Sequence, residues 1–490
     1  MSKYVMGLDL GTTSAKACIF NRVGHLVAEA EELVLSEYPK VGWVQQDAAA
    51  IERSAVLAVK NVVQKAGIAK DEIAVIGFSA AMHSLVPVSE EGMPLSPAFI
   101  WSDGRGTDQV DRLTEVERQQ FYTRTGTPVH PMTPFMKLLW MKETGFEPYH
   151  QAAYFMSIKE YLIYCWFGKR VIDYSMASAT GLFNPSVLEW DKDILELAGI
   201  RAAQLSEIVA PTTLLGTIKE EIAAEMGIAS AVPVAIGAAD GQLANLGIGA
   251  LLPGEVAVSV GTSGAIRQVT NEAKVSSRGE TFCYSFTEDS YIIGGPTNNG
   301  GIALQWLKQL LNDQGSYESF LAEAGQSAPG AEGLLFLPYI NGERAPLWNQ
   351  RARGNFYGMT VAHTKAHYVR AVLEGITFNL YQIGRALEQL AGPSRKIYVN
   401  GGLARSPIWL QMMADIFDAE IYVSENHHSA AWGAAWIGLV AIGEEKDLAS
   451  IKQNIPMGQA VLPNQENSLV YKAVYERYEK LAASIAALFE

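Results

Sequence analysis

Apolar residues open the chain in a pattern that is typical of a β-strand. The run YVMGLD occupies residues 4–9 and ends on Asp9, and Gly-Thr-Thr-Ser follows at residues 11–14. A second apolar run covers residues 17–20. Two apolar runs that are joined by a short turn containing glycine predict a β-hairpin.

The same arrangement returns near the middle of the chain. There, EVAVSV at residues 255–260 leads into Gly-Thr-Ser-Gly at 261–264 and then into AIRQV at 265–269. The two turns begin 250 residues apart (261 − 11), which is about half of the 490-residue chain. This spacing predicts two related halves rather than three unrelated domains. We place the two domains at residues 1–245 and 246–490.

Helical and strand-like periods alternate in the rest of the sequence. Asp47 is a predicted helix N-cap, and an apolar stripe with helical spacing follows it at Ile51, Ala55, Ala58, Val59, Val62 and Val63. Continuous apolar runs at residues 73–78, 232–236 and 396–399 predict buried strands. The alternation predicts an α/β fold. Because no long polar linker separates the halves, a cleft between them is the expected ligand site.

The composition excludes several classes of partner. Hydrophobic residues make up 49% and charged residues 18%, as in ordinary globular proteins. The net charge is 38 − 52 = −14, which argues against binding to nucleic acid or to an anionic membrane, although a local site can still hold an anion. The apolar stretch at residues 430–443 is too short to span a bilayer and predicts a buried helix.

The cysteines and the N-terminus indicate the cellular compartment. Cys18, Cys165 and Cys283 are odd in number and far apart, so we expect buried, unreactive thiols in a reducing compartment. The N-terminal segment reaches Asp9 without the apolar core of a secretory signal, and no signal peptide is expected. Together these features predict a cytoplasmic protein.

The two glycine turns and two carboxylates point to phosphoryl transfer. Glycine turns with neighbouring hydroxyls let backbone N–H groups approach an anion closely, so two such turns could hold one polyphosphate from both sides. Asp9 ends the first predicted strand. Asp240 lies at the end of another, in the motif Gly-Ala-Ala-Asp-Gly at residues 237–241. Carboxylates suit Mg²⁺, and a positioned carboxylate can accept the proton of an attacking hydroxyl.

Other signatures of nucleotide-binding proteins and hydrolases are missing from the sequence. It contains no G-x-x-x-x-G-K-[ST] and no G-x-G-x-x-G after a predicted strand, which excludes a P-loop and leaves a dinucleotide fold unsupported. No G-x-S-x-G elbow of a serine hydrolase occurs either. Phosphoryl transfer is the chemistry that remains.

The motifs around these residues resemble those of the FGGY carbohydrate kinase family, which belongs to the actin-like, ribonuclease-H-like ATPases. The matching segments are GLDLGTTSAK (7–16), GAADGQLANLG (237–247), SVGTSG (259–264), VNGGLARSP (399–407), MTPFMKLLW (132–140) and GNFYGMTVAHTKAHYVRAVLE (354–374). The resemblance covers nearly the whole chain. It implies an α/β fold with two ribonuclease-H-like (actin-like ATPase) domains around a central cleft.

The same resemblance implies a role for each matched residue. Asp240 would be the catalytic base that takes the proton of the sugar hydroxyl, and Asp9 together with Asp240 would hold Mg²⁺. The nucleotide is expected to be ATP, bound by Thr12, Thr13, Gly261, Thr262, Gly301, Gln305, Gly402 and Ser406.

On the sugar side, the resemblance points to Met82, His83 and Trp101, with Asp103, Arg105 and His130 as further candidates. The strings RTGTPVHPMTP (124–134) and DYSMAS (173–178) are similar to the gluconate-phosphorylating branch of the family. This similarity implies ATP-dependent conversion of D-gluconate to 6-phospho-D-gluconate. A sugar acid needs a cation for its carboxylate, and Arg105, His83 and Lys137 all stay open as that cation.

Three alternatives stay open. Xylulose kinases share the Met-His pair and the Trp-x-Asp-x-Arg pattern, so the substrate could be xylulose or another polyol. An actin-like polymerising or chaperone-like ATPase would have no use for these sugar motifs, and a non-catalytic sugar sensor would need neither Asp9 nor Asp240. A homodimer is compatible with the sequence, which does not determine the oligomeric state.

Overall fold

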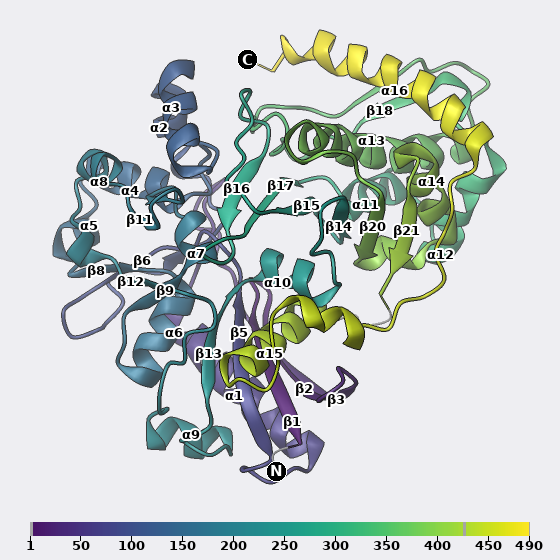
Figure 1. Cartoon of the computed structure of the whole chain (residues 1–490). Coiled ribbons are helices and arrows are strands. Elements are labelled where there is room, and N and C mark those ends of the chain that lie inside the picture. The colour runs from purple at the N-terminus through teal and green to yellow at the C-terminus, as the bar shows by residue number, and fades with distance from the viewer. Residues whose placement is uncertain (1–2, 425–427, 490) are drawn as a thin grey trace.

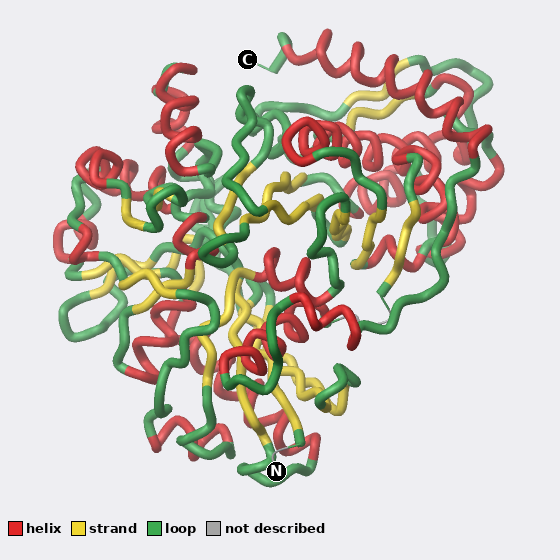
Figure 2. The backbone as a smooth tube through the Cα atoms, viewed as in Figure 1, coloured by secondary structure: helices red, strands yellow, loops and turns green. Residues whose placement is uncertain are grey.

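Two β-sheets with the same strand order form the centre of the computed structural model, which describes residues 3–424 and 428–489 (Figures 1 and 2). The N-terminal sheet has the order β13-β5-β1-β2-β3, formed by Val234–Ala239, Ile73–Ala80, Tyr4–Leu10, Ser14–Asn21 and Leu26–Leu33. The C-terminal sheet has the order β16-β17-β15-β14-β20-β21, formed by Phe282–Ser285, Tyr291–Thr297, Gly264–Thr270, Glu255–Val260, Lys396–Asn400 and Glu420–Val423.

The pairing in each sheet confirms the two predicted hairpins. Strand β1 pairs antiparallel with β2 and parallel with β5, and β14 likewise pairs antiparallel with β15 and parallel with β20. The sheets therefore share one topology, with β16 added at the edge of the second. The predicted strand at residues 232–236 begins later, at Val234.

Alternation along β1 and β5 gives the N-terminal sheet two different faces. Met6, Leu8 and Leu10 pack with Ile51 and Val59 of helix α1 (Ala48–Ala66), whose N-cap Asp47 accepts a hydrogen bond from the backbone of Ala50 as predicted. The opposite face carries Val5, Gly7 and Asp9 of β1. This face is covered by helix α15 (Ser429–Ala441), which comes from near the end of the chain (Figure 1).

The packing of α15 explains why two glycines stand on that face. A β-carbon at Gly7 would lie 1.9 Å from the carbonyl oxygen of Ala431, and one at Gly77 would lie 1.9 Å from that of Ala434. The helix backbone thus lies directly on β1 and β5. Residues 430–443 were predicted to form a buried helix, and α15 confirms this, although the sequence does not say which sheet it covers.

The C-terminal sheet lies against the long helix α13 (Lys365–Ala391). Val256, Val258 and Val260 of β14 share a core with Ile376 and Leu380 of that helix. The other helices of this region are α11 (Gly301–Leu310), α12 (Tyr317–Ala322), α14 (Pro407–Phe417) and α16 (Gln465–Ala486). The short strands β18 (Leu335–Leu337) and β19 (Asn355–Tyr357) form a separate antiparallel pair.

Most of the remaining elements lie between β5 and β13 in the sequence and form a lobe beside the N-terminal sheet (Figure 1). The helices are α2 (Thr107–Arg112), α3 (Glu115–Thr125), α4 (Pro134–Glu143), α5 (Glu147–Gln151), α6 (Ile158–Phe167), α7 (Tyr174–Ser178), α8 (Lys192–Ala198) and α9 (Glu220–Met226). The short strands are β6 (Val86–Val88), β7 (Ala98–Phe99), β8 (Tyr154–Met156), β9 (Val171–Asp173), β10 (Phe183–Asn184), β11 (Glu189–Trp190) and β12 (Glu207–Val209), while β4 (Gln45–Gln46) precedes α1.

Helix α10 (Asp240–Gly247) connects the two sheets along the chain and packs against α15. The predicted domain boundary at residue 245 falls inside this helix, and the division at that residue stays a prediction. In the described part of the chain, no helix combines the length and apolar character that a bilayer crossing needs.

Candidate active site

A large cavity of about 950 Å³ lies beside the Gly-Thr turn of the C-terminal sheet. The turn before β15, helix α11, helix α12 and the start of α14 all contribute to its wall. Six of the predicted ATP contacts line it, namely Gly261, Thr262, Gly301, Gln305, Gly402 and Ser406. The structure therefore brings together residues that lie up to 145 positions apart in the sequence (406 − 261).

The apolar part of this wall was not predicted. Tyr317 and Leu321 of α12 and Ile408 of α14 line the cavity and give it a surface suited to a flat, weakly polar group. Helix α12 is only six residues long, so its periodicity carries little signal in the sequence. Only Ile408, next to the matched segment 399–407, lay near a recognisable motif.

Thr12 and Thr13 lie in the turn between β1 and β2 and line neither this cavity nor the smaller one beside it. The carbonyl oxygen of Thr12 accepts a hydrogen bond from Nε2 of Gln46 at 2.6 Å, and Thr13 is exposed. Their predicted contact with phosphate therefore stays a prediction.

A second, smaller cavity of about 290 Å³ shares Gly261 with the first. Its wall contains Met82, His83, Trp101 and Asp240, as predicted from the sequence. The C-terminal sheet and its loops complete it with Arg267, Phe282, Tyr284 and Arg344. Asp240 thus belongs to the smaller cavity, and the Gly-Thr turn borders both.

Asp9 and Asp240 form a pair of neighbouring acidic groups at this position. Asp9 stands directly beside Ser79 in the β1–β5 register, and Oγ of Ser79 donates a hydrogen bond of 2.6 Å to Asp9. Burial and, second, the negative charge of Asp9 raise the pKa of Asp240 to about 6, while Arg267 opposes the shift. Burial also raises the pKa of Asp9.

The pair fits a divalent cation. The negative charge of Asp9 raises the pKa of Asp240, and a cation beside the two carboxylates would offset this repulsion. Asp240 also accepts a hydrogen bond from the backbone N–H of Gly241 at 2.7 Å, which orients its carboxylate at the start of α10.

His83 has an unusual backbone conformation at the end of β5. Its φ is 68°, a left-handed value that few residues other than glycine adopt. Nδ1 lies 2.7 Å from the carbonyl oxygen of Ala179, and because a carbonyl only accepts, Nδ1 carries the proton. Burial lowers the pKa of His83 to about 3, so the ring is neutral and Nε2 is free to accept a hydrogen bond from a hydroxyl.

Lys137 is fully buried on helix α4. Its Nζ donates to the carbonyl oxygen of His83 at 2.8 Å and to that of Met132 at 2.5 Å. Both of these residues line the smaller cavity. Lys137 therefore supports the cavity wall from behind.

Neither Asp103 nor Arg105 lines the cavity, and their predicted contact with the sugar stays a prediction. Nε of Arg105 donates to both carboxylate oxygens of Asp103, at 2.8 and 2.9 Å, and its guanidinium lies 3.5 Å from the ring centre of Phe99. The pair is buried, and Asp103 also accepts from the backbone N–H of Val44. Their charges neutralise each other, so the motif stabilises the lobe.

His130 is also absent from the cavity wall. Its Nδ1 accepts a hydrogen bond from the backbone N–H of Met132 at 3.2 Å, and its Nε2 lies 2.8 Å from the side-chain nitrogen of Gln350. Its ring packs edge-on against Trp348. The residue connects the lobe to a loop of the C-terminal region, and it contacts Met132, which lines the cavity.

Two arginines in the cavity wall were not assigned a role from the sequence. Arg267 stands on β15 beside Asp240, and a β-carbon at Gly241 would lie 2.9 Å from its Nε. Arg344 follows β18 in the chain, and its guanidinium lies 4.9 Å from the ring centre of Trp101. The sequence offered one signal for each arginine, namely the charged residue in the predicted strand AIRQV and the arginine in the string GERAPLWN.

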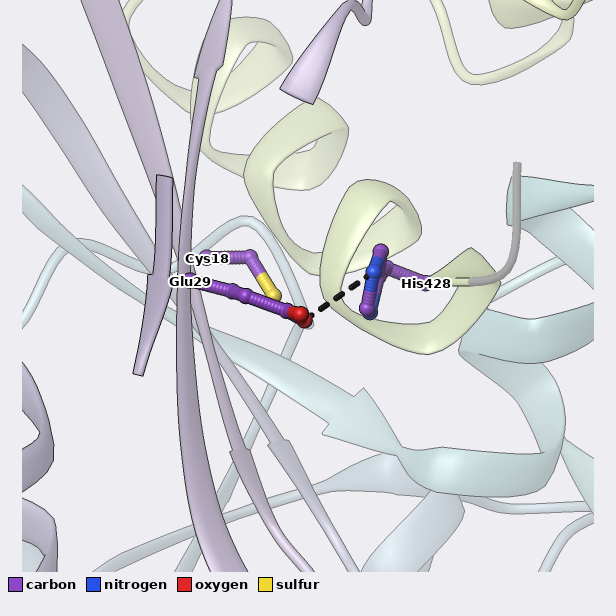
Figure 3. Close-up of side chains that lie close together, drawn as sticks. All are labelled: Cys18, Glu29 and His428. Atoms are coloured by element: carbon purple, nitrogen blue, oxygen red, sulfur yellow. Dashed lines mark ion pairs between the residues drawn. The ribbon is translucent and has the colours of Figure 1, made fainter. Parts of the chain in front are cut away.

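The three side chains Cys18, Glu29 and His428 lie close together at the start of α15 (Figure 3). Nε2 of His428 lies 3.1 Å from Glu29, which pairs across the strands with Cys18. Burial and nearby carboxylates raise the pKa of Cys18 to about 12, so it is a protonated, unreactive thiol. Cys18 and Cys283 are buried as predicted, whereas Cys165 is only partly buried.

Comparisons with known proteins identify relatives that match nearly the whole chain. Curated relatives include the gluconokinase of Bacillus subtilis (strain 168), 38% identical over 97% of this chain and 94% of its own. The xylulose kinase of Staphylococcus epidermidis (strain ATCC 12228 / FDA PCI 1200) is 30% identical over 98% of this chain and 97% of its own. The solved gluconate kinase of Lactobacillus acidophilus superposes with a TM-score of 0.96 at 34% identity, covering 99% of both chains.

Models of one protein family match both the N-terminal and the C-terminal part of the chain. The N-terminal domain of the FGGY family of carbohydrate kinases matches residues 4–247, and its C-terminal domain matches residues 256–442. The matches include Asp9, Asp240, which lines the smaller cavity, and Gly261, which lines both cavities. The chain therefore belongs to the FGGY family of carbohydrate kinases and is an ATP-dependent sugar kinase.

Proposed function

We propose that this kinase phosphorylates the terminal hydroxyl of a sugar acid and converts D-gluconate and ATP to 6-phospho-D-gluconate and ADP. The observation that carries the proposal is the position of Asp240 in a small cavity that meets the nucleotide cavity at Gly261. The 38% identity to a gluconokinase over nearly the full chain supports the choice of gluconate.

In the proposed reaction, the carboxylate of Asp240 takes the proton of the sugar hydroxyl. The hydroxyl oxygen forms a bond to the γ-phosphorus of ATP, and the bond from that phosphorus to the bridging oxygen breaks, leaving its electron pair on ADP. A raised pKa suits Asp240 to this role, because a carboxylate with pKa of about 6 is ionised at neutral pH yet more basic than an ordinary one.

The remaining residues of the smaller cavity would bind and orient the sugar. Neutral His83 can accept a hydrogen bond from a hydroxyl through Nε2, and Trp101 and Met82 offer apolar surface to the carbon chain. Asp9 and Asp240 would hold Mg²⁺, whose chemistry is to neutralise phosphate charge as the bond to ADP breaks. Walls from both sheets would limit access of water, which otherwise competes with the sugar.

The test is a panel of D-gluconate, D-xylulose, D-ribulose and glycerol with ATP. We expect the highest kcat/KM with gluconate, and ³¹P NMR should show a phosphate monoester at its terminal carbon. Preference for xylulose would support the second candidate, which the similarity to a xylulose kinase favours. ATP hydrolysis that no sugar stimulates would overturn both.

Asp240→Asn tests the catalytic role in the same assay. General-base help is worth about 10²–10⁴ in rate, so kcat should fall by at least about 100-fold while ATP binding stays near normal. Asp71→Asn, at an exposed position outside both cavities, is the matched control. Retention of substantial turnover by Asp240→Asn would remove Asp240 from the base role.

We also infer a cytoplasmic location. ATP is available there, and Cys18, Cys165 and Cys283, all free in the structure, suit a reducing compartment.

A further inference from the structure

Arg267 and Arg344 bring two positive charges into the wall of the smaller cavity. Nη1 of Arg267 and Nε of Arg344 are buried without a hydrogen-bond partner. Across residues 3–424 and 428–489, neither guanidinium forms an ion pair with a carboxylate. The one hydrogen bond from the Arg344 side chain runs from Nη2 to the carbonyl oxygen of Thr297 at 3.2 Å.

This arrangement is costly unless a ligand supplies negative charge. A buried cation whose donors are not all paired loses solvation that the protein replaces only in part, although the charges of Glu343 and Asp240 favour the protonated form of Arg344. Burial lowers the pKa of Arg344 to about 10, and the charge of Arg267 contributes to that shift. Arg344 is therefore still protonated at neutral pH, and the cavity favours an anionic group.

The two arginines lie at different parts of the cavity. Arg267 is adjacent to Asp240, where the reacting hydroxyl would lie, and it opposes the rise in the pKa of that carboxyl. Arg344 lies over Trp101, and its charge, after that of Lys137, lowers the pKa of His83. It also contributes, after Arg267, to lowering the pKa of Asp240. A six-carbon acid with its terminal hydroxyl at Asp240 would direct its carboxylate away from Arg267.

The other cations near the cavity are already occupied. Arg105 is paired with Asp103 outside the wall, and Lys137 donates to two backbone carbonyls behind it. His83 is neutral. Of the cations considered for the substrate carboxylate from the sequence, none presents a free positive charge to the cavity.

We propose that Arg344 binds the carboxylate of the sugar acid and thereby selects it over neutral sugars of the same length. This inference rests on the proposed function. A guanidinium presents parallel N–H donors that match the two oxygens of a carboxylate, and stacking on Trp101 holds its plane in place. Arg267 is a positioning residue for Asp240 in the same scheme.

The experiment compares D-gluconate with D-glucitol, which replaces the carboxylate by a hydroxymethyl group, in the intact enzyme and in Arg344→Gln. A hydrogen bond to a charged group contributes enough for about a 10- to 100-fold effect. We expect kcat/KM for gluconate to fall by that factor in Arg344→Gln, while kcat/KM for glucitol and KM for ATP change little. Arg344→Lys should restore part of the preference.

Two further variants separate the role of Arg344 in binding the carboxylate from that of Arg267 in positioning Asp240. Arg267→Gln should lower kcat for both substrates and leave their ratio near that of the wild type. Arg353→Gln, an exposed arginine nearby in the chain, should change neither value. An equal loss for gluconate and glucitol in Arg344→Gln would overturn the role of Arg344.

A measurement on the unmodified enzyme covers the case in which Arg344→Gln does not fold. D-Gluconamide keeps the shape of gluconate without its charge, and the wild type should prefer gluconate over it by about 10-fold or more. Equal kcat/KM values would overturn the proposal. Absence of gluconate turnover by the wild type would instead refute the proposed function, and the assigned role of Arg344 with it.

Discussion

Nζ of Lys137 donates a hydrogen bond of 2.8 Å to the carbonyl oxygen of His83, a residue whose φ of 68° lies in the left-handed region. A second bond from the same nitrogen reaches Met132. The buried Lys137 side chain thus fixes the backbone of two residues in the wall of the smaller cavity. These hydrogen bonds help to hold His83 in its strained conformation, although Lys137 does not itself line the cavity.

Lys137→Met should therefore weaken sugar binding more than it slows the chemical step. It removes the donor to two buried carbonyls while keeping an unbranched apolar stem of similar length. We expect KM for gluconate to rise about 3- to 10-fold, with KM for ATP unchanged, in steady-state assays. Lys142→Met, an exposed position on the same helix, is the control. Equal changes in both KM values would contradict a local effect on His83.

The same lysine should give stability a characteristic pH dependence. Burial lowers the pKa of Lys137 to about 7, below its value of 10.5 in the unfolded chain. Between these values the unfolded state binds more protons than the folded state, so this group makes stability rise with pH, by at most about 1.4 kcal/mol per pH unit. Below pH 7 both states are protonated and the contribution is constant.

Thermal unfolding of the wild type and Lys137→Met at pH 7, 8 and 9 checks this sign. The midpoint of the wild type should rise relative to that of the variant as the pH increases. Parallel behaviour of the two proteins over this range would show that Lys137 keeps its proton when folded.

The local parts of this architecture were predictable because their signals are local. Apolar alternation and the Gly-Thr turns at residues 11 and 261 predicted both hairpins, and Asp240 followed from its place at the end of a buried strand. The strand–turn–strand arrangement occurs twice, about half the chain length apart, and this repeat predicted two related halves. The central sheets of the two halves share their strand order.

Residues that meet only through tertiary packing were not predictable in the same way. Arg344 contacts Trp101 from 243 positions away in the sequence (344 − 101), and both residues line the smaller cavity. Asp103 and Arg105 lie beside Trp101 in the sequence, but their backbone directs them into an aromatic cluster. Neighbourhood in sequence points to Arg105, whereas Arg344, the cation that we propose for the substrate carboxylate, lies in the segment between β18 and β19.

The pH dependence of turnover should follow Asp240. Burial, with the added effect of Asp9, raises its pKa to about 6. Because the base must be ionised, kcat/KM for the sugar should fall about tenfold per pH unit below pH 6 and be flat just above it. Arg267 opposes the shift, so Arg267→Leu should move the acidic limb to higher pH, whereas Arg353→Gln should leave it in place. If the acidic limb of the pH profile stayed in place in Arg267→Leu, electrostatic coupling between Arg267 and Asp240 would be excluded.

The contact between Gly7 and α15 should be among the least tolerant positions of the fold. A methyl group at residue 7 would lie 1.9 Å from the carbonyl oxygen of Ala431, so either β1 or the helix must move. Since β1 carries Asp9 on that same face, the displacement also reaches the acidic pair. Overpacking of this kind costs about 1–3 kcal/mol, and we expect Gly7→Ala to lower the thermal midpoint and to reduce kcat. In the control Gly458→Ala, the new methyl would be 3.5 Å from the carbonyl oxygen of Val423, an ordinary contact. If Gly7→Ala were as stable and active as this control, α15 would not be held against the N-terminal sheet as the structure shows.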